Sequence, residues 1–417
     1  MTTVRADVSV ADQVAAIMYG AEMGDRSLER AMADELTECI AESKRTGRPL
    51  RVYAGYDPSR PDLHLGHSIT LRKLRLFQDF GHEVFFVVGT FTAQVGDNSD
   101  RTTGRPLRSA EEVREAARTY AEQCYRILDR ERTQVVYNAD WLSALTLADV
   151  VSLASHFTVQ QFLVRDNYRK RLDASDPVGL HEFLYPLLQG YDAVHLKTDV
   201  QIGATEQLFN IQAGRKLQQV FGQRGCICIT YPILVGTDGV MRMSKSAGNY
   251  VAIAAEPTQQ YGQIMSISDV TMLQWVKYVT RWIPDRIDQF IREVESGKAN
   301  PMEAKKLLAW EVVSMYNGEK AADEAQGHFE LVHQRREVPE EMAEVAFPGP
   351  TKIVDVLTQT AAASSRSEAR RLIAGRGVQL DGVVVDNPEH LVTRGAVLRV
   401  GRRRFFRLTM PESPPAP

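Results

Sequence analysis

Short runs of apolar residues alternate with stretches of helical periodicity through the first half of the chain. Runs of this length are typical of buried strands, and apolar residues three or four positions apart are typical of amphipathic helices. Strands are predicted at residues 51–56, 83–89, 134–138, 196–203 and 227–233, and the most regular helices at 110–128 and 206–221. This alternation predicts an α/β fold, with a Rossmann-like parallel sheet covered by helices on both faces.

The pattern changes on either side of this region, so that four parts are expected. Residues 1–50 predict a helical leader, which precedes the Rossmann-like part at 51–256. Residues 257–346 show helical periodicity alone, and the Pro- and Gly-containing stretch 347–350 indicates a linker. Residues 351–417 predict a small α+β domain whose hairpin turns at Asp381-Gly382. The apolar face of the leader comprises Leu28, Met32, Leu36 and Ile40.

Composition narrows the class of protein only slightly. The chain of 417 residues is 44% hydrophobic and 25% charged, which is ordinary for a folded globular protein. Its net charge of −3 gives no global attraction to nucleic acid, so any RNA-binding surface must be local. No apolar run approaches the roughly 18 residues of a membrane span, and no signal-peptide core is evident, so a cytoplasmic protein is expected. The cysteines, expected to be reduced packing residues, are Cys39, Cys124, Cys226 and Cys228.

The segment after the first predicted strand carries two histidines. His64-Leu65-Gly66-His67 stands between that strand and a helical pattern that begins near Gly66. At such a junction the free N–H groups and the dipole of the helix favour phosphate, and Gly66 lets a nucleotide approach the backbone. A pair of helix-cap histidines and a metal site are the alternatives. A metal would need further ligands, and no neighbouring cluster of Asp, Glu or His supplies them.

A second chemistry-bearing segment lies far along the chain. Arg242-Met243-Ser244-Lys245-Ser246 stands between glycine-containing stretches at 236–239 and 248–249. By itself, a basic and serine-rich pentapeptide is typical of a solvated loop. In this setting it could form a mobile loop whose two cationic side chains close over a polyphosphate.

Together these segments resemble the HIGH and KMSKS motifs of the class I aminoacyl-tRNA synthetases. The resemblance narrows to the bacterial tyrosyl-tRNA synthetases through further stretches, in family order, at 57–67, 95–99, 185–192 and 203–207. Residues 351–417 carry eleven basic against six acidic residues. That part resembles the S4 RNA-binding domain, although a solvated arginine-rich face has a similar composition. The arginines that would share one face of its helix are Arg366, Arg370 and Arg371.

The resemblance implies a reaction and its partners. The enzyme would activate L-tyrosine with ATP and Mg²⁺ to tyrosyl-adenylate and then transfer the tyrosyl group to tRNA(Tyr), with no tightly bound cofactor and no resident metal. Residues 51–256 would form the catalytic domain, 257–346 a helical tRNA-binding domain on the anticodon side, and 351–417 an S4-like RNA-binding domain. The family also implies a homodimer, to which apolar residues at 150–163 could contribute.

The family's pattern assigns roles to individual residues. The residues implied in catalysis are Ser59, His64, His67, Arg101, Arg105, Arg242 and Lys245. Tyr53 and Asp192 would meet the phenolic hydroxyl of the substrate, while its amino-acid end would meet Asp97, Tyr185, Gln189 and Gln207. The residues implied in ATP binding are Gly55, Asp57, His64, Gly66, His67, Gly203, Glu206, Met243 and Lys245. RNA would be bound by Arg366, Arg370 and Arg371.

Some positions depart from that pattern or allow a plainer interpretation. Tyr53 could be a core residue, Asp192 could pair with Lys197, and Tyr185 and Gln189 could form a helix-surface pair. Two further functions therefore stand beside a tyrosine–tRNA ligase: a specialised paralogue acting on a tyrosine analogue, in inhibitor resistance or in a biosynthetic pathway, and an RNA-binding protein on a retired synthetase scaffold. The intact polar residues argue against the second. The positions that depart are Arg60, Asn98, Asp100, Ala204, Glu206 and Arg242.

Overall fold

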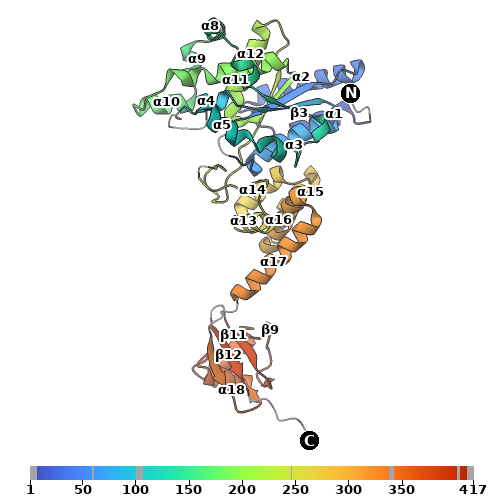
Figure 1. Ribbon diagram of the computed structural model, residues 1–417. Helices are drawn as coiled ribbons and strands as arrows, with labels where there is room; N and C mark the ends of the chain where they lie inside the picture. The colour runs from blue at the N-terminus through green and yellow to red at the C-terminus, as the bar shows by residue number, and fades with distance from the viewer. Residues whose placement is uncertain are drawn as a thin grey trace. The chain divides into compact units, whose positions relative to one another are not determined.

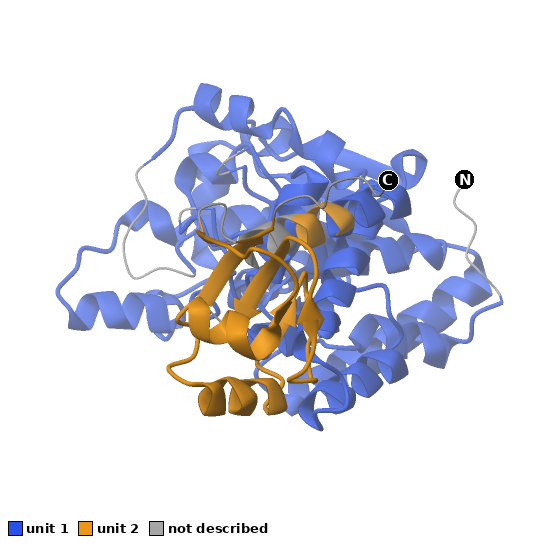
Figure 2. Cartoon of the chain, turned by 90° about the horizontal axis from the view of Figure 1, so that it is seen from below, with its two compact units in different colours: residues 1–326 blue, residues 327–417 orange. Residues whose placement is uncertain are grey.

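The computed structural model describes residues 7–58, 61–99, 107–245, 247–337, 342–401 and 404–410, with the backbone alone at 332–337. The chain divides into two compact units, residues 1–326 and 327–417 (Figure 2). The division falls within the long helix α17 (Glu319–Glu337). Among the described residues, no helix is long and apolar enough to cross a membrane.

The first unit is built on a five-stranded sheet in which every pairing is parallel. Its strands are β1 (Arg51–Tyr56), β2 (Glu83–Val88), β3 (Thr133–Tyr137), β4 (Val200–Ala204) and β5 (Ile227–Tyr231). Their order is β3-β2-β1-β4-β5, so the chain leaves β1 in one direction for β2 and returns on its other side for β4. The crevice between the carboxyl ends of β1 and β4 is the position at which such sheets bind ligands. The predicted parallel α/β fold is confirmed.

Helices cover both faces of this sheet (Figure 1). Those before β3 are α1 (Val10–Met18), α2 (Arg26–Thr46), α3 (Leu65–Asp79), α4 (Thr92–Val95), α5 (Ala110–Ala117), α6 (Tyr120–Cys124) and the 3₁₀ turn η1 (Arg130–Arg132). Those after β3 are α7 (Ala139–Leu142), α8 (Leu147–Ser155), α9 (Val159–Leu163), α10 (Asp166–Asp173), η2 (Leu180–Phe183), α11 (Tyr185–Leu196), η3 (Thr205–Gln207) and α12 (Leu208–Val220). Two expectations were wrong in detail: residues 110–128 form two short helices, and β4 begins four residues later than predicted because α11 occupies the chain up to Leu196.

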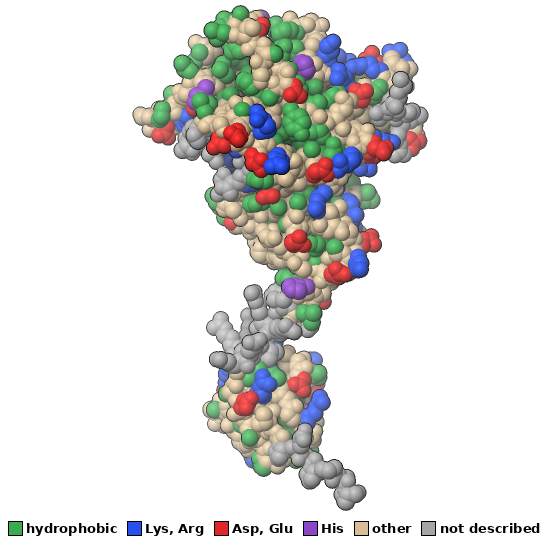
Figure 3. Space-filling model, in the orientation of Figure 1, with side chains coloured by type: hydrophobic (Ala, Val, Ile, Leu, Met, Phe, Trp, Pro, Cys, Tyr) green, Lys and Arg blue, Asp and Glu red, His purple; other side chains and the backbone are tan. Residues whose placement is uncertain are grey.

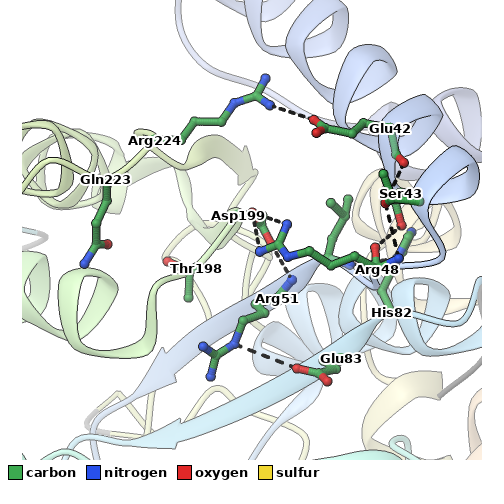
Figure 4. Close-up of polar contacts among 12 residues, drawn as sticks. Glu42, Ser43, Arg48, Arg51, His82, Glu83, Thr198, Asp199, Gln223 and Arg224 are labelled. Atoms are coloured by element: carbon green, nitrogen blue, oxygen red, sulfur yellow. Dashed lines mark hydrogen bonds and ion pairs between the residues drawn. The ribbon is translucent and has the colours of Figure 1, made fainter. Parts of the chain in front are cut away.

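The amino edge of the sheet is closed by paired polar groups (Figure 4). Asp199, just before β4, accepts hydrogen bonds from the Arg51 amide at 2.8 Å and from the Arg48 guanidinium at 3.1 Å. His82 Nδ1 accepts the Leu50 amide at 3.2 Å, which ties the start of β2 to the start of β1. These contacts tie the amino ends of β1, β2 and β4 to one another.

A helical segment follows the sheet within the same unit. Its helices are α13 (Pro257–Met265), α14 (Asp269–Val279), α15 (Pro284–Glu295), α16 (Pro301–Asn317) and α17. Trp275 of α14 is fully buried, and its indole N–H donates to the main-chain oxygen of Val235 at 2.9 Å. This bond connects the helical segment to the chain that follows β5. The helices do not continue to residue 346 as predicted, because residues 343–346 form a strand.

The second unit contains a five-stranded sheet of order β6-β12-β11-β8-β9 and a two-stranded pair, β10-β7. The elements are β6 (Ala343–Ala346), β7 (Thr351–Lys352), α18 (Ile353–Gln359), α19 (Arg366–Ala374), β8 (Val378–Leu380), β9 (Val383–Val384), β10 (Leu391–Val392), β11 (Ala396–Val400) and β12 (Arg404–Thr409). The predicted hairpin is present: Asp381 and Gly382 have φ of 47° and 83°, as a type I′ turn requires. Phe347, expected in a linker, is instead buried in this unit's core.

Candidate active site

A cavity of about 270 Å³ opens at the carboxyl ends of the strands. Most of the residues singled out from the sequence line it: Gly55, Asp57, His64, Gly66, His67, Asp97, Tyr185, Gln189, Asp192, Gly203, Glu206, Gln207, Arg242, Met243 and Lys245. Ala204, one of the positions that depart from the family's pattern, also lines it. Three predicted site residues lie outside the described residues: Ser59, Arg101 and Arg105. Two positions that depart from the family's pattern, Arg60 and Asp100, lie outside them as well.

The two histidines form one cap at the start of α3. His64 is the N-cap residue, and its Nδ1 accepts the Gly66 amide at 3.1 Å. His67 Nδ1 accepts the His64 amide, also at 3.1 Å, and the two ring centroids are 3.8 Å apart. Because both Nδ1 atoms act as acceptors, each neutral imidazole carries its proton on Nε2. The pair therefore presents two N–H donors rather than two bases.

Burial keeps both imidazoles uncharged. It lowers the pKa of His64 to about 3, and the neighbouring Lys245 ammonium contributes in the same direction. Burial, His64 and Lys245 likewise lower the pKa of His67 well below its ordinary value. Gly66 is required by the cap itself, because a Cβ at this position would lie 2.9 Å from His64 Cε1. The glycine thus makes room for a histidine ring, a role additional to the predicted approach of a nucleotide.

The loop that carries Lys245 is tied to the histidine segment. Leu65 donates its amide to the Val251 oxygen at 3.0 Å, and Ile253 donates its amide to the Leu63 oxygen at 2.9 Å. Within the loop, Asn249 Oδ1 accepts the Ser244 amide at 2.8 Å and Asn249 Nδ2 donates to Asp238 at 2.7 Å. The histidine motif is therefore joined by main-chain hydrogen bonds to the chain that follows the second motif, at Val251 and Ile253.

Lys245 itself points inward. Its side chain is buried, and its ammonium donates to the hydroxyl of Tyr120, on α6, at 2.6 Å. Together with Arg242 in the cavity wall, it places positive charge near the histidine N–H donors. This end of the cavity suits a polyanion such as a nucleotide phosphate.

The opposite end holds a buried carboxyl group that accepts two hydrogen bonds. Asp192 on α11 accepts the Trp141 indole N–H at 2.8 Å and the Asn138 amide at 3.2 Å. Burial raises the pKa of Asp192 to about 8, although these two hydrogen bonds act in the opposite direction. Asn138 also lines the cavity, whereas Tyr53 is fully buried and its hydroxyl donates to the Gln189 main-chain oxygen at 3.2 Å. Tyr53 therefore lies in the wall beside Asp192 rather than on the cavity surface.

Two further aspartates lie along the cavity. Asp57 accepts the Thr92 hydroxyl at 2.7 Å and the Tyr185 hydroxyl at 3.0 Å. Its carboxylate lies against Gly89, where a Cβ would come within 2.0 Å of Asp57 Oδ1, so a larger residue at that position would displace it.

The second of these aspartates, Asp97, is held by polar neighbours. It accepts the Ser99 amide at 2.9 Å and the Gln207 side-chain amide at 2.6 Å. Gln207 therefore lies beside Asp97, and both were predicted to meet the amino-acid end of the substrate. A carboxylate that accepts several donors is fixed in orientation and remains a good acceptor for a cationic amine.

Sequence reasoning missed three residues at the two ends of the cavity: Tyr120, Asn138 and Trp141. Asn138 ends a predicted strand and Trp141 follows it closely, so their position at a strand's carboxyl end was a usable signal. Tyr120 lies on a helix far from either motif, and the sequence carries no comparable signal for it. Among the residues that the structure describes, no group of three or more His, Cys, Asp or Glu could hold a metal ion.

The predicted RNA-binding arginines lie on α19 of the second unit. Arg366, Arg370 and Arg371 are all exposed. Arg366 forms an ion pair with Asp355 of α18 at 2.7 Å. Such a surface pair is weak, so it does not prevent this arginine from binding a phosphate.

Comparison with known families agrees with the fold and with the cavity. A family model described as tRNA synthetases class I (W and Y) matches residues 44–334, and a model of the S4 domain matches residues 351–398. The chain therefore belongs to the class I tRNA synthetases and is an aminoacyl-tRNA synthetase.

The individual relatives below are all tyrosine–tRNA ligases or tyrosyl-tRNA synthetases. The chain is 45% identical over 386 residues to a tyrosine–tRNA ligase of Thermotoga maritima. The aligned region covers 92% of this chain and 96% of that relative. It is 42% identical to a tyrosine–tRNA ligase of Dehalococcoides mccartyi, and the aligned region covers 91% of this chain and 97% of that relative. A C-terminally truncated mitochondrial tyrosyl-tRNA synthetase of Aspergillus nidulans shares the fold, with a TM-score of 0.60 and 21% identity over 78% of this chain and 94% of that one.

Proposed function

We propose that the protein is a tyrosine–tRNA ligase, which activates L-tyrosine with ATP and transfers the tyrosyl group to the 3′ end of tRNA(Tyr). The observation that carries this proposal is the polarity of the cavity. Asp192 lies at one buried end, while the histidine N–H donors, Arg242 and Lys245 lie at the other. A phenol fits the first end and a nucleotide phosphate the second.

The phenolic hydroxyl is read by Asp192, whose orientation Trp141 and Asn138 fix. A site built around a buried polar group rejects a substrate that leaves the group unpaired, and phenylalanine would do so. Sites of this kind favour the substrate that carries the hydroxyl over the analogue that lacks it by roughly 10⁴–10⁵ in kcat/KM. Tyr53 acts from the wall, beside Asp192, and the α-ammonium is bound by Asp97 with Tyr185 and Gln189.

Activation needs positioning and charge neutralisation rather than a covalent enzyme intermediate. A carboxylate oxygen of tyrosine attacks the α-phosphorus, and the bond from that phosphorus to the bridging oxygen breaks, so pyrophosphate leaves with its electron pair. His64 and His67 donate their Nε2 protons in hydrogen bonds to phosphate oxygens, and Lys245 and Arg242 neutralise the growing negative charge. Ser59, Arg101 and Arg105 belong to the same proposal. Mg²⁺ would arrive with ATP and be held mainly by its phosphate oxygens.

The remaining contacts of the ATP site follow from the cavity wall. Gly55 and Gly203 would leave main-chain surface for the adenosine, and Met243 and Glu206, which also line the cavity, would contact the nucleotide, Glu206 at its ribose. The tRNA 3′ hydroxyl then attacks the tyrosyl carbonyl carbon and AMP departs. Arg370 and Arg371, with Arg366, bind the RNA backbone from the S4-like unit, and the helical segment from 257 onward contacts the anticodon side of the tRNA. We expect the enzyme to act on tRNA in the cytoplasm.

A homodimer is part of the proposal. Large apolar side chains on α8, α9, α10 and η2 are exposed, among them Leu147 at 80% and Leu180 at 85%. Hydrophobic side chains gather over α8 in the space-filling view (Figure 3). An apolar face of this kind marks an association surface, and a second copy of the chain is the expected occupant. Sedimentation of Leu180→Asp should show a shift from dimer to monomer, and an unshifted dimer would contradict this choice of face.

The decisive experiment is amino-acid-dependent exchange of pyrophosphate into ATP. Exchange with tyrosine and near-silence with phenylalanine would support the ligase and the role of Asp192. Preference for a ring-modified tyrosine would instead favour a specialised paralogue. An absence of exchange with all of these amino acids would overturn the proposal.

A further inference from the structure

Tyr120 makes a contact that the general scheme of the site does not explain. Its ring is fully buried in the first turn of α6, and its hydroxyl accepts the Lys245 ammonium at 2.6 Å. The same hydroxyl donates to the main-chain oxygen of Asp57 at 3.4 Å. The ammonium lies 5.0 Å from the centre of the ring, on the side of the hydroxyl, so it is the oxygen of Tyr120 that binds it. One phenol therefore joins the lysine of the loop to the chain that leaves β1.

The helix that carries Tyr120 is itself fixed to the histidine segment. Thr119 and Gln123 both donate to the Pro61 main-chain oxygen, at 2.7 and 2.6 Å. The Leu63 amide in turn donates to Gln123 at 2.7 Å. Because these bonds hold the residues that lead directly into His64, α6 sets the position of Tyr120 relative to the histidine pair. Whatever holds Lys245 to Tyr120 also holds it at the phosphate end of the cavity.

We propose that Tyr120 is a positioning residue, whose hydroxyl holds the Lys245 ammonium beside the histidine pair before the nucleotide arrives. A lysine side chain has a long flexible stem, so an ammonium that is already placed loses less freedom when phosphate binds. The inference rests on the proposed function for its effect on catalysis, but the contact itself can be tested without any substrate.

The plainer interpretation makes Tyr120 an ordinary core aromatic. In that case its ring would matter and its oxygen would not, and removal of the oxygen would change stability alone. Burial raises the pKa of Tyr120, so the hydroxyl remains a neutral acceptor for the ammonium at physiological pH. Tyr120→Phe keeps the ring and removes the one atom on which the two interpretations differ. Tyr125→Phe, at the other end of α6, is the matched control.

The first test uses the full chain without substrates. Reductive methylation of lysine amines, followed by mass spectrometry, reports how fast Lys245 reacts. We expect Lys245 to react several-fold faster in Tyr120→Phe than in the unmodified protein, and at an unchanged rate in Tyr125→Phe. Equal rates in all three proteins would overturn the proposal whether or not the protein is a tyrosine–tRNA ligase.

The second test measures the consequence for the reaction. In single-turnover assays, Tyr120→Phe should lower the rate of adenylate formation about tenfold, as loss of a hydrogen bond to a charged group predicts, while the dissociation constant for tyrosine stays unchanged. In a Lys245→Ala background the same substitution should have no further effect. An equal loss in both backgrounds would show that Tyr120 does not act through Lys245. Unmodified protein that lacks tyrosine-dependent exchange would instead refute the proposed function, and the methylation result would still decide the contact.

Discussion

At the scale of single residues, the site depends on which atoms already have partners. The histidine motif presents Nε2–H donors only because main-chain amides occupy both Nδ1 atoms. The motif in the sequence could predict the position of the two rings, at a helix start, but not their tautomer or charge. The tautomer follows from the hydrogen bonds of the cap, and the charge follows from burial and from Lys245, which lies far along the chain.

Asp192 should make the stability of the protein depend on pH. An unfolded aspartate has a pKa of about 3.9, whereas burial raises the pKa of Asp192 to about 8 in the folded protein. Between these values the folded state retains a proton that the unfolded state has lost, so the free energy of unfolding falls as pH rises through this window. Urea denaturation of the unmodified protein and of Asp192→Asn should show a smaller decline for the variant between about pH 5 and pH 8. Parallel profiles for the two proteins would contradict the buried, proton-holding carboxyl.

Trp141 should control recognition of the phenol without touching it. Trp141→Phe removes the donor to Asp192 Oδ1 and leaves most of the aromatic volume in place. A buried acceptor that is left unpaired costs about 1–3 kcal/mol, so we expect tyrosine to bind roughly five- to a hundred-fold more weakly. Equilibrium titration with tyrosine measures this, and Trp310→Phe, whose indole N–H donates to Asp323 on the helical segment, is the control. Equal affinities in Trp141→Phe and the unmodified protein would remove Trp141 from the site.

At the scale of elements, the sequence was informative where a strand is mostly apolar and weak where an element is short. Strand β1 was predicted with its observed bounds, because its mostly apolar residues are followed directly by Asp57 and Pro58, which end a strand. Strand β6 was missed, since its residues are largely exposed and give no apolar run. The contacts of Tyr120 and Trp141 could not be predicted either, because they depend on how α6 and α7 pack against segments distant in sequence.

Asn249 should be as important to the loop as its charged residues. Its side chain accepts the Ser244 amide and donates to Asp238 and to the Arg242 oxygen, so it holds both sides of the loop. We expect Asn249→Ala to lower the rate of adenylate formation at least tenfold and to leave tyrosine affinity unchanged, because the loop serves only the phosphate end. Stopped-flow measurement of adenylate formation tests this. Asn387→Ala, which removes a turn contact in the second unit, should be neutral, and a comparable loss in that variant would point to a non-specific effect.

At the scale of the whole molecule, the two compact units separate two tasks. The cavity lies wholly within residues 1–326, and the exposed arginines of α19 lie in the second unit. Adenylate formation should therefore need only the first unit, whereas charging of tRNA should need both. The sequence predicted a separate C-terminal part beginning at residue 351, whereas Phe347 and β6 already belong to the second unit's core and sheet.

Truncation should reveal both the division and its boundary. A chain that ends at residue 337 should retain pyrophosphate exchange close to that of the full chain and lose most of its tRNA charging. A chain that ends at residue 350 would keep Phe347 and β6 without their partners, and it should be less soluble at the same concentration. Exchange and aminoacylation assays on both chains, with light scattering, test this. Full charging by the shorter chain would contradict the role of the second unit.

The hydrogen bonds between the histidine segment and residues 251–253 also set an order of events during synthesis. The histidine segment emerges early, but its main-chain partners at Val251 and Ile253 follow β5, the last strand of the sheet. Contacts between residues so distant in sequence form late, because the intervening chain must first be made and ordered. A nascent chain can therefore build β1, β2 and β3 on the ribosome while the phosphate end of its cavity is still unformed. Competence to consume ATP arrives only once the sheet is complete.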